Sequence, residues 1–447
     1  MAGAEGKSRG QFTTRLGFIL AAAGSAIGLG NIWKFPYLAG ENGGAVFLIL
    51  YLGFIFTIGI SVMLAELAIG RASKKNPVGA FAHLKGGKWV AVGFMSVLTG
   101  FVILSFYSVV GGWTIAYAVK TATGLLSTTD AKAFGSTFGN FVSDPMEPLF
   151  YHGVFMALTV AVVAKGVDNG IEKTCRVLMP VLFVLLVVLC IRSLTLPGAA
   201  KGVAFFLEPD FSKINAGMVI AALGHAFFSL SLGMGAMMTY GSYLPRQTSL
   251  PGAALWVTSL DTLIAVMAGF LVLPAVFAFG FDPGAGPGLT FITLPAVFSK
   301  IPFGAFFGTL FFVLLVVAAL TSAISLLEVV VAYLVDEKHI ARRPAAIGAG
   351  AVIFALGIPS SLSFGIWSDV TFLGKGFFDI MDYLASNVLL PTGGILISLF
   401  VGWVVFAKVM DGDQGGIGQG FRWAKVWRIV CQYVAPAAIA WILISGF

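Results

Sequence analysis

Long apolar segments recur along nearly the whole of this 447-residue chain, and they limit what it can fold into. A helix needs about 20 largely apolar residues to cross the hydrocarbon core of a bilayer. Only 11% of the residues are charged, whereas soluble proteins carry about 25%. This composition excludes a soluble enzyme, a disordered protein and a disulfide scaffold. We predict an all-α, polytopic membrane protein with about eleven spans, near residues 15–37, 43–70, 89–119, 148–165, 173–194, 214–240, 250–280, 303–335, 344–358, 377–406 and 424–446.

The distribution of basic residues predicts how the chain is oriented. With the N-terminus placed in the cytoplasm, 19 of the 27 Lys and Arg residues fall on cytoplasmic segments and seven fall outside. Cytoplasmic loops carry such an excess, so we expect the N-terminus inside and the C-terminus outside. The net charge of +7 therefore does not indicate nucleic-acid binding. The three cysteines show neither a paired framework nor a zinc-binding spacing,.

Two spans are interrupted in a matching way. GSAIGLGN (Gly24–Asn31) lies in the middle of the first span, and SLSLGMGA (Ser229–Ala236) lies in the middle of the sixth. For either cluster alone, close helix packing at glycines is an alternative. Together they open two units of five spans, which must be inverted relative to each other, and such pairs indicate a transporter site at the midplane. We therefore expect a tail at 1–14, repeats at 15–194 and 195–406, and a loop with a last helix at 407–447.

Charged residues inside a span are costly and are functional candidates. Asp261 lies in mid-span, with no basic residue in that span, so it must be protonated or paired,. Hard cations take oxygen ligands, and the residues alone do not choose Na⁺ over H⁺. Glu66 is interpreted as a structural partner of unwound backbone, Glu328 stays open between structural and pathway roles, and His225 is interpreted as simply hydrogen-bonded. The other candidates are Lys34, Asp379 and Asp382.

At this point the motifs carry a family resemblance. RLGFILAAAGSAIGLGNIWKFPYLAGENGGAVFLILY (Arg15–Tyr51) resembles the opening of the neurotransmitter:sodium symporter family, and the resemblance continues through MLAELAIGR, FYSVVGGWT, FFSLSLGMGAMMTYGSY, GLTFITLPAVF and AALTSAISLLE. It is nearest to the eleven-helix bacterial branch that carries hydrophobic amino acids. The resemblance implies a LeuT-type fold of two inverted five-helix repeats with discontinuous helices one and six. It also implies a multi-pass protein of the bacterial plasma membrane that imports neutral hydrophobic and aromatic L-amino acids with sodium.

The resemblance also implies two sodium sites. Family members often have asparagine where Asp261 stands, and chloride-dependent members bind an anion beside it. Because two cations near one substrate carboxylate leave excess positive charge, we hypothesise that Asp261 replaces chloride as a fixed counter-charge. The equivalents of the anion site are Tyr51, His225, Ser229 and Asp261. The implied ligands are Ala26, Asn31, Ser229 and Asp261 with the substrate carboxylate for the first ion, and Gly24, Ile27, Ala318, Thr321 and Ser322 for the second.

The implied substrate site lies at the same level. The amino-acid carboxylate would meet the NH groups of Leu29 and Gly30 at the positive end of a half-helix, and the Tyr107 hydroxyl,. An apolar wall selects neutral apolar side chains. The full implied set is Ala26, Leu29, Gly30, Ile103, Tyr107, Phe228, Ser229, Ser231, Met234, Ser322, Ala323 and Leu326.

Gates and a hinge follow from the same resemblance. Lys34, in place of the usual arginine, would pair with Asp382 at the outer gate, with Phe228 and Tyr107 as the lid above the substrate. Phe12 stands where a tryptophan is usual near the inner gate. A glycine and a proline of the fifth helix, with nine residues between them, would form a segment that can unwind. The implied inner gate is Arg9, Asp336 and Tyr243, and the implied hinge is Gly170 and Pro180.

Three rival functions stay open. A proton-coupled transporter of the same architecture would use His225, Asp261 or Glu328. A membrane enzyme would need a nucleophile and base or a metal cluster, but the four histidines lie in four separate segments and no phosphate-binding loop or zinc pair occurs,. A receptor or ion sensor without transport is the third. We expect a transporter and not an enzyme, with two Na⁺ and no organic cofactor, and with substrate and lipid but neither nucleic acid nor an obligatory protein as partners.

Overall fold

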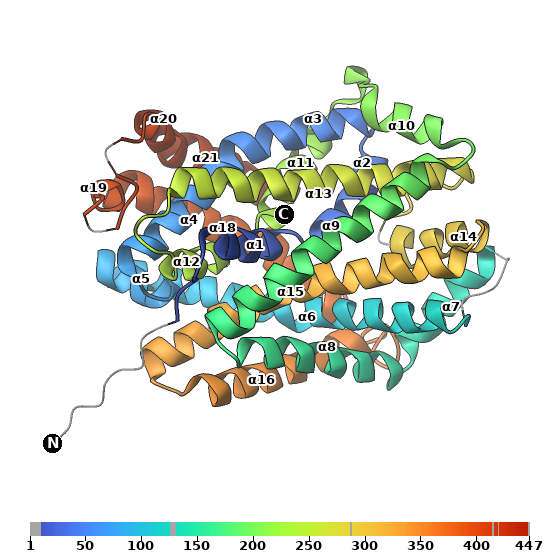
Figure 1. Cartoon of the computed structure of the whole chain (residues 1–447), viewed down its shortest axis with the longest axis horizontal. Coiled ribbons are helices and arrows are strands. Elements are labelled where there is room, and N and C mark those ends of the chain that lie inside the picture. The colour runs from blue at the N-terminus through green and yellow to red at the C-terminus, as the bar shows by residue number, and fades with distance from the viewer. Residues whose placement is uncertain (1–9, 126–130, 287, 414, 419, 446–447) are drawn as a thin grey trace.

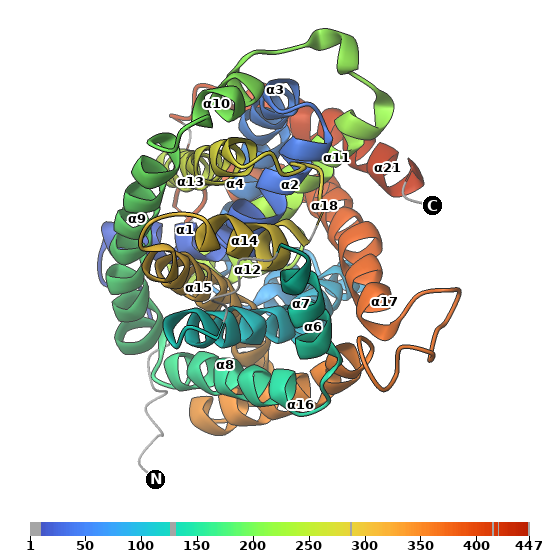
Figure 2. The same cartoon turned by 90° about the vertical axis from the view of Figure 1, so that its right-hand side faces the viewer.

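The computed structural model describes residues 10–125, 131–286, 288–413, 415–418 and 420–445. Every regular element within these ranges is a helix, apart from one isolated bridge between Phe372 and Lys375. Figure 1 shows the long helices running side by side along the long axis of the molecule, and Figure 2 looks nearly along them. The prediction of an all-α, polytopic membrane protein is confirmed.

The first five predicted spans each coincide with a helix or with a pair of helices. Span one is broken after α1, and a π-helical turn, Gly30–Lys34, leads into α2. Further π-helical turns lie between α3 and α4, at Ile55–Gly59, and before α9, at Val167–Glu172. The helices are α1 (Arg15–Ala26) with α2 (Phe35–Glu41), α3 (Ala45–Phe54) with α4 (Ile60–Ser73), α6 (Val90–Ala122), α8 (Glu147–Val163) and α9 (Lys173–Leu194).

The second half has the same kind of organisation. Span six is broken between α11 and α12, and π-helical turns lie at Leu384–Leu389, Phe400–Val405 and Val430–Val434. The helices are α11 (Ala216–Ser229) with α12 (Ala236–Ser242), α13 (Leu250–Ala278), α15 (Gly304–Lys338), α16 (Arg342–Leu362), α17 (Phe377–Tyr383) with α18 (Leu390–Leu399) and α19 (Phe406–Met410), and α20 (Ala424–Ile429) with α21 (Ala435–Ser445).

Length and apolarity support this number of spans. Within the described residues, eight helices are long and apolar enough to cross a membrane, and two bent helix pairs raise the number to ten. One of those pairs is α1 with the helix Gly30–Glu41, bent by 50°. The interrupted pair α11 and α12 is too short to qualify by length, and it accounts for the one predicted span that remains, the sixth.

Short helices lie in the connections between spans. α5 begins at Pro77 because Pro suits the first helical position and because the Asn76 side chain accepts a hydrogen bond from the NH of Gly79 over 3.1 Å,. The connection at 281–302 holds a π-helical turn, Leu289–Thr293, and the short helix α14. The short elements are α5 (Pro77–Leu84), Gly87–Trp89, α7 (Ala131–Ser143), α10 (Ala199–Leu207), Phe211–Lys213 and α14 (Leu294–Ser299).

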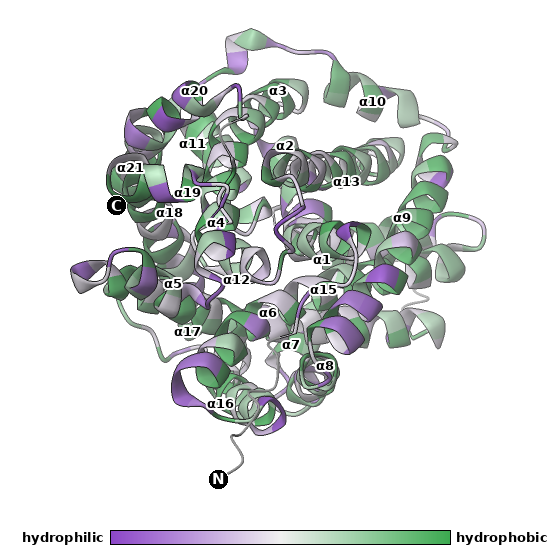
Figure 3. Ribbon diagram, turned by 60° about the vertical axis from the view of Figure 1, so that its left-hand side comes forward, coloured by the Kyte–Doolittle hydropathy of each residue, from purple (hydrophilic) through white to green (hydrophobic). Residues whose placement is uncertain are grey.

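Burial separates central helices from peripheral ones. In α15, 78% of the most apolar stretch is buried inside the protein, against 33% for the segment Val167–Leu194 and 22% for Ala424–Ser445. The outward side of α9 exposes large apolar side chains such as Val177 and Val184. Figure 3 shows the long helices mostly hydrophobic, with hydrophilic segments at helix ends and in loops. The peripheral helices therefore face lipid, and α15 forms the centre of the bundle.

Small residues allow the central helices to approach closely. A Cβ added at Gly70 of α4 would lie 2.0 Å from the Met238 carbonyl oxygen of α12. No side chain fits there, so glycine is required for this contact. Close approach at small residues is how membrane helices associate, since burial from water supplies little driving force in lipid. The inner half of the sixth span is thereby held against the second span.

Candidate functional site

Two chain breaks lie against each other at the centre of the molecule. α1 ends at Ala26, and Ile27 is extended; α11 ends at Ser229. In the second break Ser231 has a φ of 54° and Gly233 a φ of 84°, a left-handed conformation that favours glycine,. The Ser231 hydroxyl donates to the Ser25 carbonyl oxygen over 2.8 Å, which joins the two breaks directly.

Glu66 holds the second break from α4. The NH of Gly233 donates to one of its carboxylate oxygens over 2.7 Å, and the side chain is fully buried. This contact agrees with the interpretation of Glu66 as a structural partner of unwound backbone. Unwound backbone at membrane depth is tolerated only where it is buried in protein or lines a cavity, and this break satisfies that condition.

The predicted ligands of the first ion converge on Asp261 of α13. The Asn31 side-chain NH₂ donates to its carboxylate over 2.8 Å, and the Ser229 hydroxyl donates over 2.9 Å. The Tyr51 hydroxyl donates to the same carboxylate over 3.2 Å. Asn31 also accepts from the NH of Gly28 over 3.0 Å. All of these polar side chains are buried, so the centre presents oxygen atoms in an environment shielded from water. Ala26, the remaining predicted ligand, lines the adjoining cavity.

His225 lies beside this cluster, with its ring 5.4 Å from that of Tyr51 and 5.7 Å from that of Phe35. Neither ring nitrogen has a hydrogen-bond partner within the described part of the chain, although the ring is buried. The hydrogen bond expected of His225 is therefore not among those that the described residues form. Aromatic packing holds the ring instead.

The predicted ligands of the second ion also come together, between α1 and α15. The Ser322 hydroxyl lies 3.2 Å from the Ile27 carbonyl oxygen and 3.4 Å from that of Gly24. The Thr321 hydroxyl donates to the Ala318 carbonyl oxygen over 3.0 Å. A Cβ at Gly24 would lie 3.2 Å from the Cβ of Thr321, so the two helices touch at this point. The set consists of carbonyl and hydroxyl oxygens only, which suits a hard cation.

A small cavity of about 20 Å³ lies between the two ion centres, and that is room for about one water molecule,. Gly28 is required beside it, since a Cβ there would lie 2.4 Å from the Ser322 hydroxyl and 2.9 Å from that of Tyr107. The NH of Leu29 donates to the Tyr107 hydroxyl over 3.2 Å. Ser25 and Gly28 line the cavity but were not predicted, although both belong to the GSAIGLGN motif. The predicted residues that line it are Ala26, Gly30, Ile103, Tyr107, Phe228, Ser231, Met234, Ser322 and Leu326.

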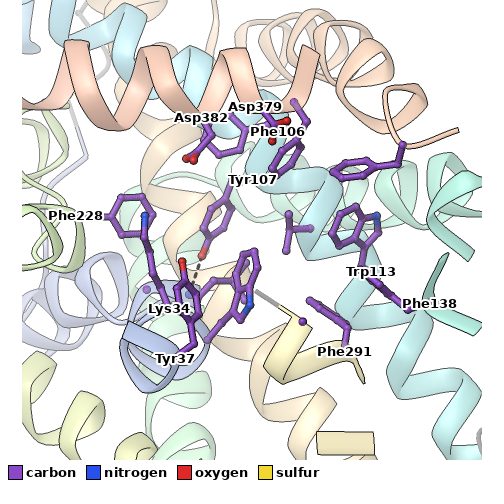
Figure 4. A pocket seen from close by; sticks show the side chains of 17 residues that line it. Lys34, Tyr37, Phe106, Tyr107, Trp113, Phe138, Phe228, Phe291, Asp379 and Asp382 are labelled. Atoms are coloured by element: carbon purple, nitrogen blue, oxygen red, sulfur yellow. Dashed lines mark hydrogen bonds between the residues drawn. The ribbon is translucent and has the colours of Figure 1, made fainter. Parts of the chain in front are cut away.

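Other predicted substrate residues lie around this cavity. Ala323 is fully buried on α15 but is not one of the lining residues, and Ser229 points toward Asp261. Leu29 lines a larger cavity of about 270 Å³ that also reaches Gly30, Tyr107 and Phe228. We call this larger space the vestibule. Its aromatic wall, shown in Figure 4, includes Phe106, Trp113, Phe138 and Phe291, which sequence reasoning did not select.

Lys34 and Asp382 both line the vestibule (Figure 4). The Lys34 ammonium lies 4.6 Å from the centre of the Phe228 ring. Asp382 accepts a hydrogen bond from the Ser386 hydroxyl over 3.0 Å. Among the ion pairs of the described residues, none joins Lys34 to Asp382. The two residues thus share a cavity, and their pairing stays a prediction.

On the inner side, the gate residues lie near the ends of α12 and α15. The Tyr243 hydroxyl donates to the fully buried carboxylate of Glu328 over 2.6 Å, and Arg342 forms an ion pair with the same carboxylate. Asp336 accepts hydrogen bonds from the backbone and side chain of Asn76, both over 3.1 Å. These contacts favour a structural role for Glu328. Arg9 lies outside the described residues.

The predicted hinge lies in a helix that is continuous in this structure. Gly170 belongs to the π-helical turn before α9, and Pro180 lies within α9. The neighbouring Glu172, which sequence reasoning missed, is buried and accepts hydrogen bonds from the NH and the hydroxyl of Thr13, each over 2.7 Å. A Glu in a short polar loop gives no sequence signal of such a contact. The chain segment before α1 is thereby attached to the predicted hinge.

In a helical membrane protein, two interrupted spans that meet at buried, oxygen-rich centres are typical of the class of secondary transporters. A sequence model of the sodium:neurotransmitter symporter family matches residues 9–136 and 151–447. The chain belongs to this family of sodium-dependent transporters, whose members are not enzymes.

Several relatives match over nearly the full length. An uncharacterised sodium-dependent transporter of Bacillus subtilis, YhdH, is 42% identical over 97% of each chain, and one of Haemophilus influenzae is 38% identical over 98% of each. The crystal structure of MhsT in complex with L-phenylalanine is 49% identical, with a TM-score of 0.91 over 98% of this chain and 100% of that one. The fold is therefore the LeuT type that the sequence predicts.

Proposed function

We propose that this protein is a sodium-coupled symporter that imports neutral hydrophobic and aromatic L-amino acids by alternating access. The observation that carries the proposal is the convergence of Asn31, Ser229 and Asp261 at the two chain breaks. Membership of a sodium-dependent family supports the coupling ion. The likeness to a transporter solved in complex with L-phenylalanine supports the substrate class.

Two sodium ions would bind at the two oxygen-rich centres. In the first, Asp261 supplies a negative charge, Asn31 and Ser229 supply neutral oxygens, and the Ala26 carbonyl and the substrate carboxylate complete the shell. In the second, carbonyls of Gly24, Ile27 and Ala318 join the hydroxyls of Thr321 and Ser322. Because the substrate carboxylate is a ligand of the first ion, ion and amino acid stabilise each other's binding.

The substrate would bind at the small cavity between these centres, which holds about one water molecule in this structure and would widen as the amino acid enters,. We place its carboxylate against the NH groups of Leu29 and Gly30, with the Tyr107 hydroxyl beside them. Its ammonium group would contact the carbonyl oxygens of Ala26, Phe228 and Ser229 and the Ser231 hydroxyl. The cavity is lined by Ile103, Met234 and Leu326, and because this wall carries no charge it favours apolar side chains. Met234 adapts to side chains of different shape.

Chloride independence would follow from Asp261. The carboxylate would supply at this position the negative charge that chloride supplies in chloride-dependent relatives. Tyr51 and His225, two equivalents of the anion site, lie close to it. A fixed carboxylate balances the two cations without a second ion. Transport in chloride-free medium is the expected consequence.

The transport cycle needs no covalent chemistry. Substrate and sodium enter through the vestibule, Lys34 and Asp382 approach each other, and Phe228 and Tyr107 cover the site. Opening at Gly170 and Pro180 then admits water to the second ion, and the inner gate of Arg9, Asp336 and Tyr243 releases the load. Two ions moving down a tenfold gradient and across 100 mV supply about 7 kcal/mol, enough for substantial accumulation.

We place the protein in the plasma membrane of a bacterium, with its N-terminus in the cytoplasm and its C-terminus outside. Repeats at 15–194 and 195–406 would then form the transport unit, with 1–14 as a cytoplasmic tail and 407–447 as a loop and last helix. The excess of Lys and Arg on the segments assigned to the cytoplasm supports this orientation,.

Uptake of a panel of labelled amino acids into proteoliposomes tests the substrate class. With Na⁺ outside, we expect uptake of phenylalanine, tryptophan, tyrosine, leucine and isoleucine, and little uptake of glutamate, lysine or glycine. With K⁺ or choline outside, uptake should fall to the level of empty vesicles. Preferential uptake of a charged amino acid would contradict the proposed pocket.

A further inference from the structure

The 363–376 loop, which joins α16 to α17, exposes an unusual number of large apolar side chains. Leu373 is 87% exposed, and Phe372 is 68% exposed. Polar residues such as Asp369 and Lys375 lie among them. Moving one apolar side chain of this size out of water is favourable by about 1.5–3 kcal/mol. Several such side chains on a loop surrounded by water would therefore be costly. The exposed apolar residues of the loop are Ile366, Trp367, Val370, Phe372 and Leu373.

The backbone holds the apex of this loop in one conformation. Phe372 and Lys375 exchange two backbone hydrogen bonds, of 2.9 and 3.1 Å, which close a tight turn. Leu373 lies within that turn with a φ of 52°. A left-handed conformation costs a residue other than glycine about 1–2 kcal/mol. The fold therefore presents the most exposed leucine outward at the apex, at a cost in backbone strain.

The loop extends sideways from the helix bundle. Figure 2 looks nearly along the helices, and there the loop projects sideways beyond α17 and past the outline of the bundle. The helix before it, α16, exposes Ile347 and Val352, which are 60% and 58% exposed. A loop that follows a lipid-facing helix and extends sideways from its end lies at the level of the lipid headgroups.

We infer that the apex of the 363–376 loop, with Phe372 and Leu373 at its tip, inserts into the headgroup–acyl boundary of the outer leaflet and anchors the outer end of α17 to lipid. Aromatic and aliphatic side chains with charged neighbours are typical of this boundary, since apolar parts reach the acyl chains while Asp369 and Lys375 stay among the headgroups. A second copy of the chain is the less favoured occupant. A stable dimer buries about 1,200 Å² or more, and a narrow convex apex offers little of that area.

The anchor connects to the vestibule through the base of the loop. The NH of Phe378, in the first turn of α17, donates to the Ser363 hydroxyl over 3.3 Å, and the Phe364 and Phe378 rings lie 5.1 Å apart. Phe364, Phe378 and Asp379 all line the vestibule. The two ends of the loop are thus fastened together beside the wall that carries Asp382, so lipid binding at the apex restrains that wall.

Spin-label accessibility in phospholipid nanodiscs tests the inference. The variant Leu373→Cys would carry a nitroxide, and the buried native cysteines Cys175, Cys190 and Cys431 would be replaced beforehand. Collision with oxygen, which concentrates in lipid, would be compared with collision with a water-soluble nickel chelate. Control labels would be placed at Ser136, on the exposed side of α7, and at Val352, on the lipid side of α16.

We expect the oxygen-to-nickel ratio at Leu373→Cys to exceed that at the Ser136 position several-fold and to approach that at the Val352 position. Val370→Cys provides a second position on the same loop if the first variant does not fold. A ratio equal to that of the Ser136 position would overturn the inference. Spin–spin coupling between two copies at the apex would also overturn it, because the occupant would then be a second chain.

Discussion

The side-chain amide of Asn31 and the carboxylate of Asp261 lie 2.8 Å apart, although 230 positions separate them in the chain. Both are fully buried. Asn31 follows the break of the first span, whereas Asp261 lies in the middle of α13. This bond therefore ties the chain just after an unwound segment to a continuous helix, at the depth where an ion would bind.

Replacing Asp261 with Asn removes the negative charge and keeps the shape of the side chain. We expect chloride-free, Na⁺-driven uptake to fall to background, and added chloride to restore part of it, since an anion then balances the two cations. Thr262→Ala is a suitable control, because within the described part of the chain that hydroxyl bonds inside its own helix, to the Thr258 carbonyl oxygen. Normal chloride-free uptake by Asp261→Asn would refute the role of Asp261 as counter-charge.

Replacing Ser322 with Ala removes a hydroxyl that contacts three backbone carbonyls of the first break. We expect the Na⁺ concentration for half-maximal uptake to rise about tenfold, which corresponds to the loss of about 1.4 kcal/mol from one oxygen ligand. The substrate concentration for half-maximal uptake at saturating Na⁺ should change less. Thr309→Ala, on the exposed side of the same helix, is the control. An unchanged Na⁺ requirement would exclude Ser322 from the second ion site.

Replacing Leu326 with Phe narrows the proposed side-chain pocket beside Met234 and Ile103. We expect uptake of tryptophan and phenylalanine to fall by about tenfold or more while uptake of valine and leucine is retained, because an apolar pocket discriminates size by about 1–3 kcal/mol. Competition of labelled leucine by unlabelled tryptophan measures the change directly. If large and small substrates lost uptake equally, the cavity would not be the side-chain pocket.

Replacing Glu328 with Gln leaves the partly buried Arg342 without its carboxylate partner and weakens the bond from Tyr243. We expect a loss of about 3–5 kcal/mol of stability, as for other broken buried pairs. A lower thermal unfolding temperature of the purified protein would report it. Glu147→Gln, in the more exposed pair with Lys120, should shift the unfolding temperature little,. If the variant instead kept its stability and lost a pH dependence of uptake, Glu328 would belong to a proton pathway.

The sequence predicts the two breaks well because several signals coincide there. Glycines at 28, 30, 233 and 235 weaken the helix in mid-membrane, and the neighbouring Asn and Ser residues supply polar groups that need partners. The structure ends α1 at Ala26 and α11 at Ser229, within the predicted segments. The apolar runs likewise predict helix positions to within a few residues.

Contacts that depend on distant parts of the chain were not predictable. Glu172 accepts a hydrogen bond from Thr13, which lies 159 positions away in the chain, and no local sequence pattern predicts this pair. The Lys34 ammonium lies over the Phe228 ring, and the residue types alone do not decide between this contact and an ion pair with Asp382. The aromatic wall of the vestibule has the same composition as ordinary lipid-facing helix surface, so only the folded arrangement identifies it.

The driving ion is the central claim, and one measurement tests it most directly. Purified protein in proteoliposomes would be given labelled L-phenylalanine under an inward Na⁺ gradient, or under an inward proton gradient without Na⁺. We expect accumulation above equilibrium with the Na⁺ gradient, its collapse when Na⁺ is equalised, and none with the proton gradient alone. Accumulation driven by protons in the absence of Na⁺ would contradict the account.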